Sequence, residues 1–144
     1  MTAQEEKELL LRVVTRLAGM LLAEGGLLPF GGTLGPGRNV KLLRPKSMKR
    51  DVTRDELEQY WVRELRKAVA TSECKTVCHC ADVRVPGGET GLASAILVHV
   101  EHADSTSEDI LYPYRKDMIL GVVFGEPTRV ATAHQVFACP PKAS

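Results

Sequence analysis

The chain contains 144 residues, of which 44% are hydrophobic, and it carries 19 Lys and Arg against 18 Asp and Glu. A chain of this length can bury one hydrophobic core but hardly two, so we expect a single domain over residues 1–138. The nearly balanced charge argues against a general nucleic-acid binder and against an acidic, solvated tail.

The apolar runs and the first residues of the chain favour a soluble, cytoplasmic protein without a membrane partner. The longest apolar run is too short to cross a bilayer, and residues 1–8 are polar and acidic, unlike a signal peptide. In such a chain the four cysteines are expected to be reduced thiols. Pro140 and Pro141 mark residues 139–144 as a flexible C-terminal tail.

A capping box predicts the start of a first helix. Thr2 and Glu5 have the spacing at which each side chain can satisfy a free backbone N–H of the other. The helix should run to about Glu24, because Gly25 and Gly26 follow. Its apolar stripe consists of Leu10, Val13, Val14, Leu17 and Leu21.

Residues 27–45 predict a small hairpin between two helices. Phe30, Gly32 and Leu34 alternate, and the segment 35–39 supplies turn residues before the alternation resumes. The run 29–32, Pro-Phe-Gly-Gly, has two interpretations: a ligand-facing loop, or a turn that needs a flexible backbone.

Residues 38–54 form a basic segment in which seven cations face a single acid, Asp51. This charge could neutralise phosphates of a nucleic acid, but it lacks interleaved aromatic residues. A solvated loop that balances the acidic first helix is the simpler interpretation. The cations are Arg38, Lys41, Arg44, Lys46, Lys49, Arg50 and Arg54.

A second capping box, Thr53 with Glu56, predicts the next helix. Its buried face should contain Leu57, Trp61, Leu65 and Ala68, which share one stripe at helical spacing.

From residue 75 to 137 the hydrophobic pattern changes to strict alternation through five strand-like runs. We therefore predict an α+β fold: two helices packed on one face of a curved antiparallel β-meander, with a small hairpin between the helices. The last hairpin is expected to pair Val123 with Val130.

A candidate metal site depends on the strand register. If the turn at residues 86–89 pairs Val85 with Leu92, then Cys78 lies opposite His99, and Cys80 lies nearby on the face away from the helices. Thiolates and a neutral imidazole are zinc ligands. The alternative is that both cysteines are small, half-buried strand residues in a sheet or subunit contact.

A candidate ligand pocket follows from the same register, on the face toward the helices. It would be lined by His79, Tyr112, Tyr114 and Trp61, with Arg115 at its rim, and would suit a small amphipathic or anionic ligand. In an enzyme, His79 would act as a general base beside one of the tyrosines. The alternative is that the aromatic side chains fill a solid core.

Four short motifs carry a resemblance that covers most of the chain: Pro29-Phe30-Gly31, Asp82-Val83-Arg84, residues 98–102 (Val-His-Val-Glu-His), and Pro113-Tyr114-Arg115. With these motifs the chain resembles small uncharacterised bacterial proteins that have a helix, a Pro-Phe-Gly hairpin, a second helix and a β-meander. The order of elements also resembles the cone-shaped fold of the nuclear-transport-factor-like superfamily. That resemblance implies a pocket, and often a dimer formed through the sheet.

The sequence favours a non-enzymatic binding or protein-interaction domain, because no constellation has the arrangement that catalysis requires. An exposed sheet face with Cys80, Leu97 and Leu111 would make it a homodimer. The competing hypothesis is the small pocket enzyme or ligand binder that uses His79 with Tyr112 or Tyr114.

Overall fold

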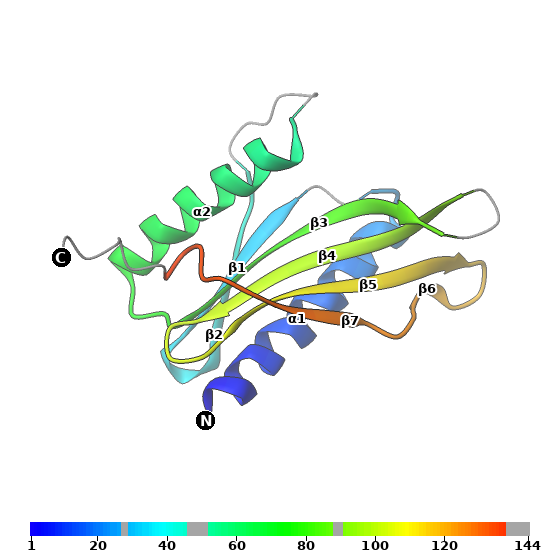
Figure 1. Cartoon of the computed structure of the whole chain (residues 1–144). Helices are drawn as coiled ribbons and strands as arrows, with labels where there is room; N and C mark the ends of the chain where they lie inside the picture. The colour runs from blue at the N-terminus through cyan, green and yellow to red at the C-terminus, as the bar shows by residue number, and fades with distance from the viewer. Residues whose placement is uncertain (27–28, 46–51, 88–90, 138–144) are drawn as a thin grey trace.

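The computed structural model describes residues 1–26, 29–45, 52–87 and 91–137. The middle of the basic segment, residues 46–51, and the expected tail, residues 139–144, therefore lie outside the described residues. Two helices and seven strands are present in the described part (Figure 1). They are α1 (Ala3–Ala23), β1 (Phe30–Gly35), β2 (Asn39–Leu43), α2 (Arg54–Thr71), β3 (Thr76–Pro86), β4 (Leu92–His102), β5 (Ser107–Asp117), β6 (Gly121–Phe124) and β7 (Thr128–Thr132), with a short 3-10 turn at Pro36–Arg38.

Capping starts both helices where the sequence predicts. The Thr2 hydroxyl accepts the N–H of Glu5 at 3.1 Å, and the Glu5 carboxylate accepts the N–H of Thr2 at 3.3 Å. In α2, the Thr53 hydroxyl accepts the N–H of Glu56 at 3.2 Å. The Glu56 carboxylate there accepts a hydrogen bond from the hydroxyl of Thr53 instead of from its backbone N–H. Both predicted helix starts are confirmed.

The strands form one curled antiparallel sheet in the order β2-β1-β3-β4-β5-β6. The predicted hairpin between the helices is confirmed as β1 and β2, and it belongs to this sheet because β1 pairs with β3. The predicted pairing of Val123 with Val130 is wrong. Strand β5 is long enough to take both partners: its second half pairs with β6, and its first half pairs with β7.

The two helices cover opposite faces of this sheet. Buried α1 residues pack on Cys78, Cys80 and the inward residues of β4, whereas Trp61 and Leu65 of α2 pack on Val77. Figure 1 shows α1 behind the sheet and α2 on the side facing the viewer. The α+β class with helices packed on a curved antiparallel sheet is confirmed, but the two helices do not share one face.

Adjacent glycines of β1 explain how both helices approach the sheet closely. A Cβ at Gly31 would lie 3.0 Å from the Trp61 ring of α2, and a Cβ at Gly32 would lie 3.5 Å from Leu10 and Val14 of α1. Successive residues of a strand point to opposite faces, so each glycine makes room for one helix.

No helix in the described part of the chain combines the length and the apolar character that a bilayer-spanning segment needs.

We predict that Gly31→Ala destabilises the fold by about 1–3 kcal/mol through overpacking. The added methyl group would lie 3.0 Å from two Trp61 ring atoms and 3.4 Å from the carbonyl oxygen of Cys78. Gly35→Ala is the matched control in the same strand, because its nearest atom lies at an ordinary 3.6 Å. Urea unfolding measures both. Equal free energies of unfolding would contradict the packing of α2 on β1.

Candidate functional site

The predicted zinc site is not formed, because β3 and β4 pair one residue away from the predicted register. His79 pairs with His99, and Cys78 pairs with Val100. The connection between the strands is one residue shorter than predicted, with Pro86 instead of Val85 paired to Leu92, and a slip of one residue moves a side chain to the other face. Cys78 and Cys80 therefore face α1, away from His99. Burial raises the pKa of the Cys78 thiol to about 12.

The predicted ligand pocket is also not formed, because its members lie on opposite faces. Tyr112 and Tyr114 pack on the α1 side, where the Tyr114 hydroxyl donates to Asp82 at 2.8 Å. His79 and Trp61 lie on the α2 side. Arg115 is exposed and pairs with Asp117 at 3.3 Å. His79 therefore has no tyrosine beside it to form the predicted catalytic pair.

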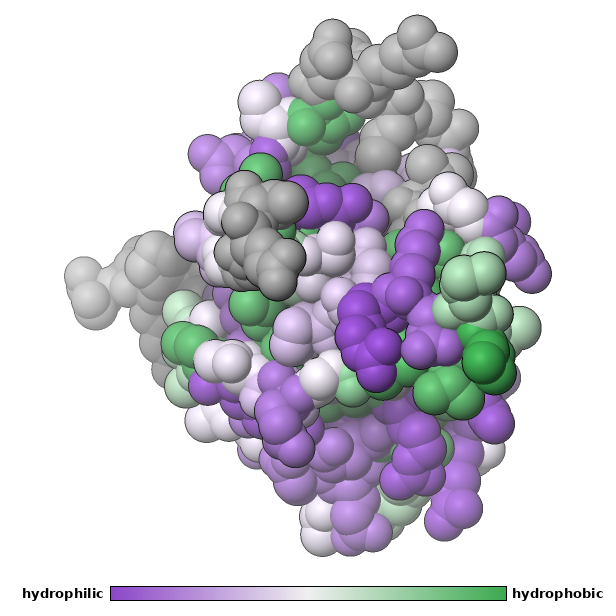
Figure 2. All heavy atoms as spheres, turned by 90° about the vertical axis from the view of Figure 1, so that its right-hand side faces the viewer, coloured by the Kyte–Doolittle hydropathy of each residue, from purple (hydrophilic) through white to green (hydrophobic). Residues whose placement is uncertain are grey.

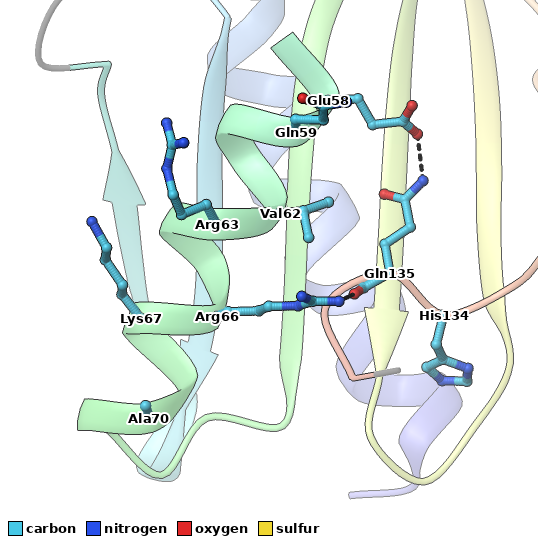
Figure 3. A pocket seen from close by; sticks show the side chains of 9 residues that line it. All are labelled: Glu58, Gln59, Val62, Arg63, Arg66, Lys67, Ala70, His134 and Gln135. Carbon is cyan, nitrogen blue, oxygen red and sulfur yellow. Dashed lines mark hydrogen bonds between the residues drawn. The ribbon is translucent and has the colours of Figure 1, made fainter. Parts of the chain in front are cut away.

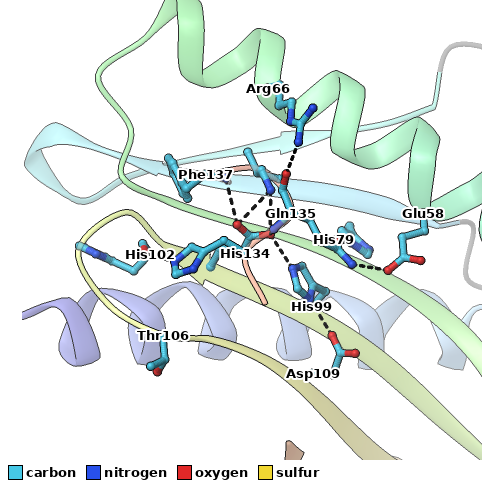
Figure 4. Close-up of polar contacts among 12 residues, drawn as sticks. Glu58, Arg66, His79, His99, His102, Thr106, Asp109, His134, Gln135 and Phe137 are labelled. Atoms are coloured by element: carbon cyan, nitrogen blue, oxygen red, sulfur yellow. Dashed lines mark hydrogen bonds and ion pairs between the residues drawn. The ribbon is translucent and has the colours of Figure 1, made fainter. Parts of the chain in front are cut away.

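The corrected register brings together a different cluster, centred on His99 (Figure 4). Its Nδ1 lies 2.6 Å from Oδ1 of Asp109, its partner across β4 and β5, and its Nε2 lies 2.6 Å from Oε2 of Glu101. A ring that bonds to a carboxylate through both nitrogens must donate from both, so His99 is an imidazolium. Burial opposes this charge, but the two carboxylates outweigh it and raise the pKa to about 9.

Glu101 connects this cluster to the end of the described chain. Its side chain is fully buried and accepts three successive backbone N–H groups, from Gln135 at 2.8 Å, Val136 at 3.0 Å and Phe137 at 3.1 Å. Burial alone would raise the pKa of Glu101, but His99 and these N–H groups lower it to about 2. The carboxylate therefore fixes residues 135–137 above the sheet.

His79 stacks on His99, with ring centroids 5.1 Å apart. Burial and the positive charge of His99 lower the pKa of His79 to about 4, so its ring is neutral near pH 7. Its Nε2 lies 3.4 Å from Oε1 of Gln135. The cavity beside these rings and Asp109 measures about 60 Å³. This space is large enough for only a few water molecules.

Gln135 joins the buried cluster to a surface groove between α2 and residues 134–135 (Figure 3). Its side-chain amide donates to Glu58, and its carbonyl oxygen accepts Nη2 of Arg66 at 2.6 Å. The groove has a volume of about 790 Å³ and is open to solvent. Its α2 wall includes Glu58, Val62, Arg63, Arg66, Lys67 and Ala70.

Sequence reasoning missed most of this site. The signal for the cluster was the pair His99 and Glu101, two ionisable residues that share one face of an apolar strand. Such a pair predicts a buried ion pair, but it did not reveal Asp109 as the third member. Nothing in the sequence around Gln135 predicts its contacts with residues 34 to 77 positions away.

The largest exposed apolar side chains lie at the turn from β5 to β6. Met118, Ile119 and Leu120 are 104%, 92% and 71% exposed, and the Asp117 carboxylate holds the turn by accepting the N–H groups of Ile119 and Leu120. Figure 2 views this end of the molecule and shows apolar side chains gathered on one flank. This turn, residues 118–120, is called the apolar turn below.

No family model matches the chain, and neither the curated proteins nor the solved structures contain a match to it.

We predict that the free energy of unfolding falls by about 2 kcal/mol between pH 6.5 and pH 8.5, because the unfolded chain loses the His99 proton over this range while the folded chain largely keeps it. The pKa of His99 is 6.5 in the unfolded chain and about 9 in the fold. Its contribution is therefore complete below pH 6.5 and is lost as the pH rises through 9. His79 contributes little to this slope. Its pKa is lowered from 6.5 to about 4, so its effect on the free energy of unfolding falls mainly between these two pH values.

Urea unfolding at the two pH values measures this slope. The range ends below 9.0, the ordinary pKa of the thiols. His99→Gln should remove most of the slope, whereas His134→Gln, whose ring bonds the carbonyl of His102 instead, should keep it. A flat profile for the unmodified chain would contradict an imidazolium at His99.

Proposed function

We propose that the chain is a non-enzymatic interaction domain that pairs with a second copy through its sheet. The supporting observation is an uncovered part of the sheet on the α2 side. Helix α2 packs on β1 and β3, and Figure 1 shows no helix over β5 and β7 on that side. An apolar surface of this kind is typical of a contact between subunits.

The uncovered surface includes three apolar residues from neighbouring strands together with the partly exposed carboxylate of Asp109, and we call it the open sheet face. Leu97 and Leu111 are direct cross-strand partners, and Val130 lies two pairs further along β5 and β7, opposite Asp109. Val130 is 56% exposed, and both leucines are partly exposed. Cys80, which the sequence placed on this surface, lies against α1 instead. The contact we propose therefore involves Leu97, Leu111 and Val130.

The chemistry of the described site supports a binding role over catalysis. Both ring nitrogens of His99 are bonded to carboxylates, so His99 has no free nitrogen to take a proton from a substrate. The buried thiols of Cys78 and Cys80 have raised pKa values, which disfavours the reactive thiolate. Free, buried thiols also fit the cytoplasmic location that we propose.

Val130→Lys is expected to convert the dimer to a monomer at low micromolar concentration, because it places a charge among the apolar side chains of the proposed contact. Native mass spectrometry over a concentration series measures the subunit number. Met20→Lys is the matched control, since Met20 is 57% exposed and lies on α1 across the sheet. That variant should remain a dimer.

Ile119→Lys in the apolar turn distinguishes between the two exposed apolar surfaces. A dimer that survives Val130→Lys and is lost with Ile119→Lys would move the contact to that turn. A chain that is monomeric without any substitution, at all concentrations, would refute self-association.

A further inference from the structure

We propose that the groove between α2 and residues 134–135 binds an acidic peptide segment of a partner protein. This inference rests on the proposed role as an interaction domain, but it does not depend on self-association, since the groove and the open sheet face are lined by different residues.

The charge of the groove comes from three cations on one side of α2. Arg63, Arg66 and Lys67 follow a spacing of three and four residues, which places them on the same face of a helix. Within the described chain, Lys67 pairs with Glu64 at 3.0 Å, whereas neither arginine has a carboxylate within 4.0 Å. The acid that lines the groove, Glu58, accepts a hydrogen bond from Gln135. Two guanidinium groups are therefore left to attract an anion.

Arginine suits a carboxylate partner in particular, because its planar group presents five N–H donors in a fork that matches two oxygens. Arg66 uses one donor on the carbonyl oxygen of Gln135, and this bond orients the remaining donors at the groove. Arg63 lies over the Tyr60 ring, with 5.8 Å from Cζ to the ring centroid, which also restricts its position. Both guanidinium groups are thus held near the groove before a ligand arrives.

The opposite wall of the groove is fixed by the buried cluster. Glu101 accepts hydrogen bonds from the N–H groups of residues 135–137. The side-chain amide of Gln135 bonds to His79 through its oxygen and donates to Glu58 through its nitrogen. His134 is held as well, because its Nε2–H donates to the carbonyl oxygen of His102 at 3.0 Å. A wall that is already ordered loses little conformational entropy when a ligand binds.

The shape of the groove favours an extended peptide over a nucleic acid. Its volume of about 790 Å³ is open to solvent along α2, and Val62 and Ala70 offer apolar contacts for an aliphatic side chain. Binding of single-stranded nucleic acid relies on stacking of bases on aromatic side chains, and among the residues that the structure describes no Phe, Tyr or Trp lines the groove. We therefore expect a segment with several Asp or Glu residues around one aliphatic residue.

The test uses a fluorescein-labelled peptide of sequence Glu-Asp-Val-Glu-Asp-Gly and the full chain, with binding followed by fluorescence anisotropy. We expect saturable binding that weakens as salt is added. The double variant Arg63→Glu with Lys67→Glu should lose at least tenfold in affinity. The matched control is Arg12→Glu with Arg16→Glu, two exposed positions on α1 that change the net charge by the same amount. That control should stay within twofold of the unmodified chain.

A milder variant, Arg63→Gln with Lys67→Gln, removes two of the three cations without adding acids and should lose affinity even if the first variant fails to fold. Three results would overturn the inference: no saturable binding of the peptide, an equal loss in the α1 control, or tighter binding of a thymidine hexanucleotide of similar charge. Loss of peptide binding together with an intact dimer in native mass spectrometry would refute this inference and leave the proposed function standing.

Discussion

The buried negative charge of Glu101 is the constraint on which this structure depends. An isolated carboxylate inside a protein costs several kcal/mol unless it is paired and hydrogen-bonded. Glu101 is fully buried, and it obtains one positive partner in His99 and three N–H donors from residues 135–137. The sheet and the end of the described chain therefore have to be positioned together.

Each further member of the cluster follows from this requirement. His99 can remain charged inside the protein because Asp109 occupies its second ring nitrogen. The charge of His99 in turn helps to keep the stacked ring of His79 neutral. A neutral His79 can then share the amide of Gln135, whose other contacts reach α2 through Glu58 and Arg66. One buried charge thus connects three strands, a helix and the wall of a groove.

The same arrangement borders one of the two surfaces that we propose for binding. Residues 134 and 135 bond to His102 and Glu101 of β4, and they form the wall of the groove opposite α2 (Figure 1). Helix α2 covers β1 and β3, a groove remains between it and Gln135, and Leu111 and Val130 stay uncovered on β5 and β7. The ion cluster therefore orders one wall of the groove through the N–H groups that Glu101 accepts.

Local features of this fold could be predicted from the sequence, whereas pairing across the sheet could not. Thr2 and Thr53 mark helix starts through contacts three residues away, and these are readable in any sequence. The register of β3 and β4 depends on the length of the connection after Pro86, and alternation alone does not give that length.

Burial on both faces also weakened the hydrophobic signal. Val77 faces α2 and Cys78 faces α1, and both are fully buried, so their polarity does not show which face each one occupies. The one-residue error that resulted placed His99 beside Cys78. The prediction that both helices pack on one face was wrong for the same reason, because apolar residues on both faces of β3 do not show that each face has its own helix.

The most direct test of this account is an NMR titration of the His99 ring, with nitrogen and carbon shifts assigned through His99→Gln. The account predicts that both ring nitrogens carry protons at pH 7.5 and that the ring titrates with a pKa of about 9. A ring that loses its proton near its ordinary value of 6.5 would show that the carboxylates do not hold a charged His99. The central role of the ion cluster would then be wrong.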